Sequence, residues 1–132
     1  MKVVVIYSGG LDSTTLLYHL RAEGCELKAL SADYGQRHLS REMAAADVVC
    51  GRLGVERRTV DLTALAGFFG TNAITNRSID VPEGEYSAAT LPLTTVPNRN
   101  MVLLSLGIAW AADLGFDAVA FGAHGGAHAN YP

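Results

Sequence analysis

A glycine-containing turn near the N-terminus is the part of this sequence best suited to bind a phosphate group. The turn consists of Ser8, Gly9, Gly10, Leu11, Asp12 and Ser13. Its glycines let backbone amides approach a ligand closely, and a helix that begins after them directs free N–H groups at an anion. The same residues could form an ordinary strand-to-helix turn in which Asp12 or Ser13 caps the helix. We favour the phosphate-binding interpretation, with Asp12 as the candidate ligand of a Mg²⁺ ion that bridges its carboxylate to the phosphate.

The turn lacks the lysine that follows the glycines in Walker A loops. Lys2 and Lys28 are the only lysines of the chain, and neither follows the turn. Without that lysine, transfer of the terminal phosphoryl group is the less natural chemistry. The turn resembles instead the PP-loop of ATP pyrophosphatases. This resemblance implies that ATP binds with its α-phosphate open to attack by a carboxylate, an adenylation that releases pyrophosphate.

Two further stretches carry an arginine where the chain turns. The first consists of Asp33, Tyr34, Gly35, Gln36, Arg37 and His38, and the second of Val96, Pro97, Asn98, Arg99 and Asn100. Arg37 and Arg99 have forked, permanently charged groups that suit a phosphate or a substrate carboxylate. The alternative is a pair of ordinary surface arginines. The glycine and proline turns around them favour the functional interpretation.

The neighbouring polar residues have two interpretations each. Asn98 and Asn100 could bind the edge of a purine-like base or could simply cap a helix. Tyr34 could stack on a purine or pack beneath the loop. His38 is expected to be a residue of the first helical turn rather than a base.

The histidines and cysteines predict no metal site within the chain. His124 and His128 are four residues apart, but the two glycines between them disfavour the helix that would bring both onto one metal. Two cysteines cannot form a disulfide framework. Cys50 lies at an apolar position of a predicted helix and is expected in the core, whereas Cys25 has no identifiable partner. His19 is expected to be solvated.

Strands and helices that alternate along the chain must position these residues. The strands are expected at residues 3–7, 27–34, 55–62 and 117–121, the third of them near an edge of the sheet. One helix should begin near Asp12 and end at Gly24, and others should span residues 38–53 and 98–114, the last being the most buried. Residues 67–97 predict a long functional loop. This order predicts an α/β fold with a parallel sheet covered by helices on both faces, whose strands end at the candidate site.

Composition limits the class of protein further. The 132 residues are 49% hydrophobic and 17% charged, which excludes a disordered chain and indicates one compact domain. No apolar stretch is long enough for a membrane span, and no secretory signal is visible. The net charge of -3 predicts no general attraction to nucleic acid. We therefore expect a cytoplasmic protein that acts on small molecules. The sequence leaves its oligomeric state open, and the open states include a homo-oligomer.

Together with Val81-Pro82-Glu83-Gly84, Gly122-Ala123-His124 and Asn130-Tyr131-Pro132, the motifs resemble the 7-cyano-7-deazaguanine synthase (preQ0 synthase, QueC) family over essentially the whole chain. The resemblance implies a Rossmann-like PP-loop fold and the ATP-dependent conversion of 7-carboxy-7-deazaguanine and ammonia to preQ0, a queuosine precursor. Catalytic roles are expected for Asp12, Arg37 and Arg99. ATP should contact the turn from Ser8 to Ser13 together with Asp33 and Tyr34. Substrate should contact Gln36, His38, Asn98, Asn100 and His124.

The sequence departs from the family pattern in two places. The family continues beyond Pro132 into a segment whose cysteines bind Zn²⁺, so the zinc ligands are not in this chain. Ala127 stands where the family has an aspartate. We therefore expect residues 1–132 to form a single nucleotide-binding domain that binds ATP but turns over slowly alone. The alternatives are another PP-loop enzyme, of the tRNA-thiolating or lysidine-forming type, and an inactive ATP-binding fragment.

Overall fold

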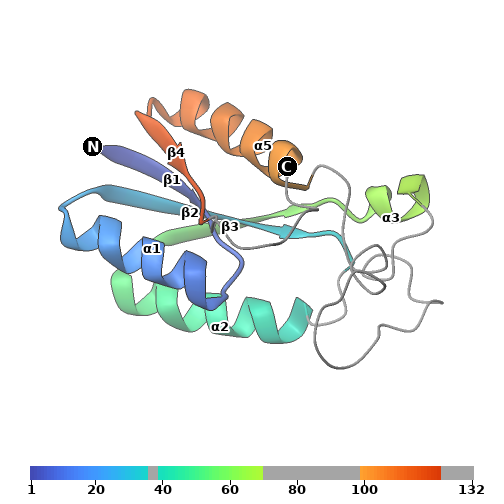
Figure 1. Cartoon of the computed structure of the whole chain (residues 1–132), viewed down its shortest axis with the longest axis horizontal. Coiled ribbons are helices and arrows are strands. Elements are labelled where there is room, and N and C mark those ends of the chain that lie inside the picture. The colour runs from blue at the N-terminus through green and yellow to red at the C-terminus, as the bar shows by residue number, and fades with distance from the viewer. Residues whose placement is uncertain (36–38, 70–98, 123–132) are drawn as a thin grey trace, which may run out of the picture.

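The computed structural model describes residues 1–35, 39–69 and 99–122, and strands alternate with helices through most of them (Figure 1). In chain order the elements are β1 (Lys2–Ile6), α1 (Leu11–Ala22), β2 (Glu26–Asp33), α2 (Leu39–Leu53), β3 (Glu56–Asp61), α3 (Ala64–Phe69), α5 (Arg99–Leu114) and β4 (Ala118–Ala120). The four predicted strands and three predicted helices are confirmed, with ends that differ by a few residues.

The strands form one parallel sheet in the order β3-β2-β1-β4. β1 lies between β2 and β4, so that Val3 pairs with Leu27 on one side and with Ala118 on the other. The Lys2 amide also donates to Asp117 Oδ2 at 2.8 Å. β3 lies at an edge, as predicted from its mixed polarity. All four strands therefore present their carboxyl ends at the same edge of the sheet.

Helices cover both faces of this sheet, which confirms the predicted fold class. α1 and α2 pack on one face, where Val3, Val5 and Leu17 are at most 3% exposed (Figure 1). α5 packs on the other face, against Val4 and Leu30. Because successive residues of a strand point to opposite faces, the uninterrupted valines of β1 supply both layers of the core.

Among the positions whose burial is described, α5 has a smaller share of exposed residues than α1 or α2, in line with the prediction that it is the most buried helix. Its burial is still one-sided, because Met101 and Ile108 are 57% and 60% exposed. Among the described helices, α5 alone covers its face of the sheet, so its outer side remains in solvent. Apolar content alone does not determine burial, because burial depends on how many neighbours pack around the helix.

Helix α3 extends into the start of the predicted long loop. The loop was expected from Gly67, yet the chain is helical from Ala64 to Phe69. The turn before it is organised by Asp61, whose Oδ1 accepts hydrogen bonds from the Thr63 amide at 2.9 Å and the Thr63 hydroxyl at 2.7 Å. These hydrogen bonds hold the pKa of Asp61 below its ordinary value. Residues 70–97 of the predicted loop lie outside the described residues.

No helix in the described ranges combines the length and the apolar character needed to cross a membrane.

Candidate functional site

The predicted phosphate-binding turn joins β1 to α1 at the carboxyl edge of the sheet. Gly10 occupies the N-cap position of α1, and no side-chain cap hydrogen bond is made there. The prediction that Asp12 or Ser13 caps this helix is therefore wrong. Gly10 has an extended backbone and α1 begins at Leu11, so Asp12 and Ser13 fall inside the first turn, beyond the cap position. The first turn of α1 thus offers backbone amides that a bound anion could use.

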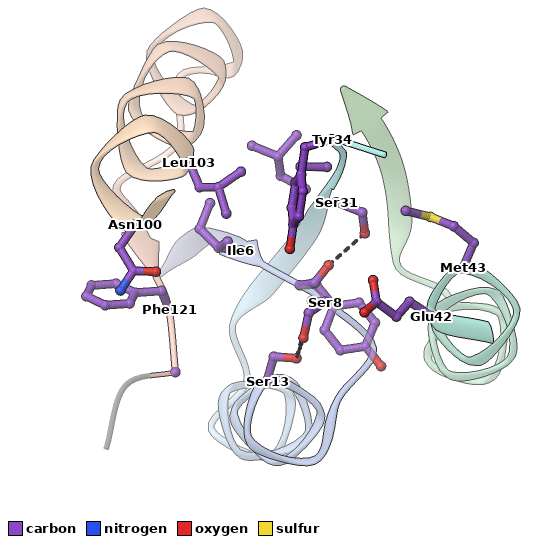
Figure 2. Close-up of a pocket in the computed structure, with 14 residues that line it drawn as sticks. Ile6, Ser8, Ser13, Ser31, Tyr34, Glu42, Met43, Asn100, Leu103 and Phe121 are labelled. Atoms are coloured by element: carbon purple, nitrogen blue, oxygen red, sulfur yellow. Dashed lines mark hydrogen bonds between the residues drawn. The ribbon is translucent and has the colours of Figure 1, made fainter. Parts of the chain in front are cut away.

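Two serines fix the shape of this turn. Ser8 Oγ and Ser13 Oγ are 3.1 Å apart, and the Ser8 amide donates to Ser13 Oγ at 3.3 Å (Figure 2). The Gly10 amide donates in turn to Ser8 Oγ at 3.2 Å. Ser13 is 8% exposed, whereas Ser8 is exposed. The buried serine thus anchors the turn, while the exposed one can also reach a ligand.

The strand end beneath the turn is held by buried hydrogen bonds. Ser31 Oγ on β2 donates to the Tyr7 carbonyl at 2.7 Å. Tyr7 Oη and Thr14 Oγ1 are 2.8 Å apart, which ties β1 to the first turns of α1. Tyr7 is 1% exposed, and burial raises the pKa of its phenol, so the side chain stays neutral at physiological pH.

Gly9 brings the turn into direct contact with α2. Its φ is +89°, and a Cβ built there would lie 2.7 Å from the Glu42 carbonyl oxygen. A Cβ at Gly122, just after β4, would lie 3.4 Å from the Asp12 carbonyl carbon. The turn therefore packs against α2 at Gly9 and lies next to the segment after β4, and only glycine fits at Gly9.

A pocket of about 250 Å³ opens beside the turn. Its polar lining includes Ser8, Ser13, Ser31, Tyr34, Glu42 and Asn100. Figure 2 shows Tyr34 and Glu42 directed into the same space as Ser8. Leu30, Leu103 and Phe121 supply apolar walls. The volume is close to the lower end of the ~300–1,000 Å³ typical of small-molecule sites.

The structure brings together only some of the residues predicted for the site. Ser8, Ser13, Tyr34 and Asn100 line the pocket, but Asp12 does not and is exposed on α1. Gly9, Gly10 and Leu11 complete the turn, with Leu11 82% exposed. Asp33 is half-buried at the end of β2, where its Oδ1 accepts a hydrogen bond from the Gly35 amide at 3.0 Å. Arg99 is the first residue of α5, and five other predicted site residues lie outside the described residues: Gln36, Arg37, His38, Asn98 and His124.

Sequence reasoning missed several residues of the pocket. Ser31 could have been found from the sequence, because it is a hydroxyl residue between the apolar residues Leu30 and Ala32 near the end of β2. In the structure it is 3% exposed. Glu42 and Met43 gave no signal, since they resemble ordinary positions of an amphipathic helix. They reach the pocket because α2 packs against the turn.

Other candidate groups have structural positions. Cys50 is 3% exposed in the core, as predicted, and burial raises the pKa of its thiol. His19 is exposed and lies 3.2 Å from Glu23, which confirms its solvated position. Within the described ranges, no three His, Cys, Asp or Glu side chains come close enough together to hold a metal ion.

Similarity to known proteins agrees with this arrangement. The 7-cyano-7-deazaguanine synthase 1 of Colwellia psychrerythraea is 48% identical over 131 residues, which cover 99% of this chain and 59% of that protein. The 7-cyano-7-deazaguanine synthase of Chromohalobacter salexigens is 49% identical, covering 99% of this chain and 52% of its own length. The chain thus spans little more than half the length of these relatives.

A solved structure shares the fold at low identity. The NH3-dependent NAD synthetase of Campylobacter jejuni superposes with a TM-score of 0.57 and 18% identity, covering 89% of this chain and 45% of that one. The family model described as "Queuosine biosynthesis protein QueC" matches residues 2–132. The chain therefore belongs to the QueC family of queuosine biosynthesis proteins.

Proposed function

We propose that this chain is the nucleotide-binding part of a 7-cyano-7-deazaguanine synthase, which uses ATP to convert 7-carboxy-7-deazaguanine and ammonia to preQ0. The observation that carries the proposal is the turn from Ser8 to Ser13, which leads into an α1 N-terminus without a side-chain cap and borders the pocket. Relatives named 7-cyano-7-deazaguanine synthase match 99% of the chain. Within this proposal, residues 1–132 are a single nucleotide-binding domain.

The turn binds the β- and γ-phosphates of ATP as a pyrophosphate unit. Backbone amides at the start of α1 and the hydroxyl of Ser8 donate hydrogen bonds to the phosphate oxygens. Tyr34 and the apolar walls accommodate the adenine ring, while Asp33 supports the turn at Gly35. The α-phosphate then remains accessible at the mouth of the pocket.

Asp12 is the residue of the turn that would hold a Mg²⁺ ion beside the bound phosphates. Asp12 is exposed in the first turn of α1, where an unscreened carboxylate would repel phosphate. Mg²⁺ is commonly held by one or two carboxylates together with substrate phosphates, so a single aspartate suffices when the phosphates supply the other ligands. The ion would neutralise charge that develops on the departing pyrophosphate.

The substrate carboxylate is the nucleophile. One of its oxygens forms a bond to the α-phosphorus, the bond from that phosphorus to the bridging oxygen breaks, and pyrophosphate leaves. Ammonia then displaces AMP to give the amide. A second ATP adenylates the amide oxygen with release of pyrophosphate, and loss of two protons from the nitrogen and departure of AMP, which carries that oxygen, give the nitrile. Arg37 and Arg99 hold the carboxylate or the pyrophosphate in line for this attack. Gln36, His38, Asn98, Asn100 and His124 contact the deazapurine.

The nucleotide products test this proposal. The protein is incubated with labelled ATP, ammonia and 7-carboxy-7-deazaguanine, and the nucleotides are separated. We expect AMP and pyrophosphate, formed slowly by residues 1–132 and faster by a chain of the relatives' full length. ADP as the main product would refute the adenylation. ATP binding without AMP formation in the longer chain would favour an inactive nucleotide-binding protein.

A further inference from the structure

Helix α2 forms the wall against which the phosphate-binding turn packs. A Cβ at Gly9 would meet the Glu42 carbonyl oxygen at 2.7 Å and the Ala46 amide nitrogen at 3.5 Å. Ala46 is 1% exposed, whereas Gly9 and Glu42 are half-buried, so the contact lies at the margin of the core. The position of the turn therefore depends on the position of two successive turns of α2.

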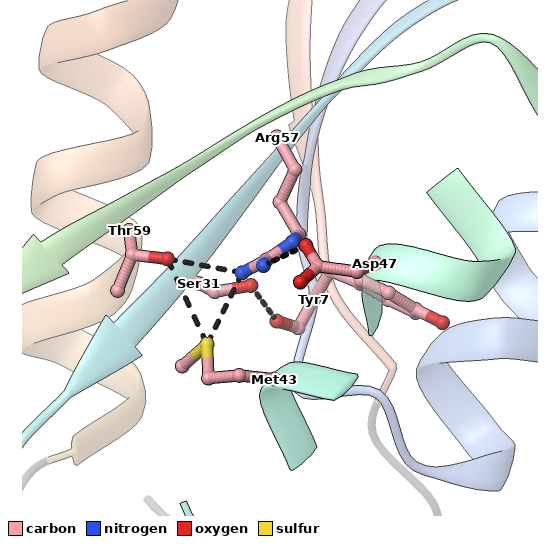
Figure 3. Close-up of polar contacts among 6 residues, drawn as sticks. All are labelled: Tyr7, Ser31, Met43, Asp47, Arg57 and Thr59. Carbon is pink, nitrogen blue, oxygen red and sulfur yellow. Dashed lines mark hydrogen bonds and ion pairs between the residues drawn. The ribbon is translucent and has the colours of Figure 1, made fainter. Parts of the chain in front are cut away.

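A largely buried arginine on the edge strand contacts the same two turns of α2. Arg57 of β3 pairs through Nη2 with Asp47 Oδ1, and its Nη1 lies 3.1 Å from Met43 Sδ (Figure 3). Nη1 also donates to Thr59 Oγ1 at 2.9 Å. The Arg57 side chain is 11% exposed. A single guanidinium thus connects β3 to residues 43 and 47 of α2.

The contacts of α2 with the turn and with the arginine alternate along the helix. Gly9 approaches residues 42 and 46, and Arg57 holds residues 43 and 47. Met43 also lines the pocket, as does Glu42. Any displacement of α2 away from β3 would therefore move the wall of the turn and one wall of the pocket together.

We propose that Arg57 is a positioning residue for the phosphate-binding turn, because it fixes α2 at the distance from β3 that Gly9 requires. The inference rests on the proposed binding of phosphate at that turn. Burial of a charged guanidinium costs free energy unless its hydrogen-bond partners are well placed. The Nε of Arg57 has no hydrogen-bond partner among the described residues, so the contacts of Nη1 and Nη2 must offset that cost. The two-pronged contact needs the planar fork of arginine, which a lysine does not provide.

The test measures the affinity of the full chain for inorganic pyrophosphate in four variants. Arg57→Met should weaken binding by about tenfold, within the range typical of coupling through packed elements. Arg57→Lys keeps the charge but cannot hold both positions, so most of the loss should remain. Arg58→Met is the matched control, because Arg58 lies on the same strand but pairs with Glu56 at 2.9 Å and stacks on Trp110. It should bind as the unaltered protein does.

Val55→Ala controls for a general loss of stability. Val55 is 7% exposed and belongs to the same core. Its amide donates a hydrogen bond to the Cys50 carbonyl at 2.9 Å, away from the turn and the guanidinium. This variant should lose stability while its pyrophosphate affinity stays unchanged. Equal losses of affinity in Val55→Ala and Arg57→Met would overturn the inference, because the effect would follow stability alone. Full affinity in Arg57→Lys would also overturn it, because charge alone would then suffice.

The remaining outcomes separate this inference from the proposed function. If the unaltered protein binds no pyrophosphate, both the phosphate site and the role of Arg57 are refuted. If the unaltered protein and Arg57→Met bind pyrophosphate equally well, only the role of Arg57 is refuted. Should Arg57→Met fail to fold, Asp47→Asn replaces it, since Asp47 is 71% exposed and its loss is milder. We expect that variant to weaken binding by about threefold, and unchanged affinity would overturn the inference.

Discussion

Replacement of Gly9 by alanine should damage the phosphate-binding turn far more than an ordinary glycine substitution would. The added Cβ meets the Glu42 carbonyl oxygen at 2.7 Å, a distance at which backbone must move. The φ of +89° adds strain of about 1–2 kcal/mol for an L-residue. Overpacking against α2 costs a further ~1–3 kcal/mol. We expect Gly9→Ala to lose about 2–5 kcal/mol of stability, of which only part comes from φ.

Gly24 provides a matched control for this prediction. Its φ is +84°, but no atom lies within 4 Å of a Cβ built there. Gly24→Ala should therefore lose only the ~1–2 kcal/mol of backbone strain. The difference between the two variants in urea unfolding isolates the close approach of α2 to Gly9.

Binding measurements complete the comparison. Each charge-assisted hydrogen bond to phosphate contributes about 1.5–3 kcal/mol, so displacement of one amide weakens binding by at least about tenfold. Calorimetric titration with Mg·ATP should show that loss in Gly9→Ala, whereas Gly24→Ala should bind with unchanged affinity. Unchanged ATP affinity in a folded Gly9→Ala protein would refute the phosphate assignment, and equal unfolding free energies in Gly9→Ala and Gly24→Ala would refute the close contact.

Three further predictions concern charges and exposed surface. Asp12→Ala should weaken Mg·ATP binding but not the binding of ATP in the presence of a chelator, where the bare carboxylate only repels phosphate, and equal losses in both titrations would argue against a metal at Asp12. Because hydrogen bonds from Thr63 lower the pKa of Asp61 from its ordinary 3.8, this carboxylate stabilises the fold above that pH and loses its contribution as the pH falls through the lowered pKa. Urea unfolding of Asp61→Asn should accordingly depend less on pH between about 5 and 2, and an unaltered pH dependence would contradict this role. Met101 and Ile108 are more than half exposed, so replacing both by lysine should reduce the binding of a hydrophobic dye without loss of unfolding free energy, and destabilisation would show that they are packed in solution.

The sequence predicts most of the fold because its signals are local. Val3 to Val5 form an uninterrupted apolar run, which is typical of a strand covered on both faces. The turn that follows could be recognised from its glycines and serines alone. The exposure of Met101 and Ile108 on α5 has no such local signal, because it depends on which other elements pack beside that helix.

Only part of the candidate site can be predicted from the sequence, because some of its residues come together only through packing between elements. Ser8 and Tyr34 stand at the ends of strands, where position along the chain already indicates the site. Glu42 reaches the pocket only because α2 packs on Gly9, and Arg57 reaches α2 across the edge of the sheet. Contacts of this kind join residues from different elements, and no local pattern of residue types encodes them.

The central place of β1 in the sheet has a consequence for synthesis of the protein. β1 leaves the ribosome before the other strands that the structure describes, yet its partner β4 lies 115 residues later, as the pairing of Val3 with Ala118 shows. At roughly 5–20 residues per second, β1 waits about 6–23 s with one edge unpaired. During that interval Val4 also lacks its cover from α5, so an apolar strand edge is open to other nascent chains. The phosphate-binding turn directly follows β1. It can therefore reach its final geometry only after translation has passed residue 120.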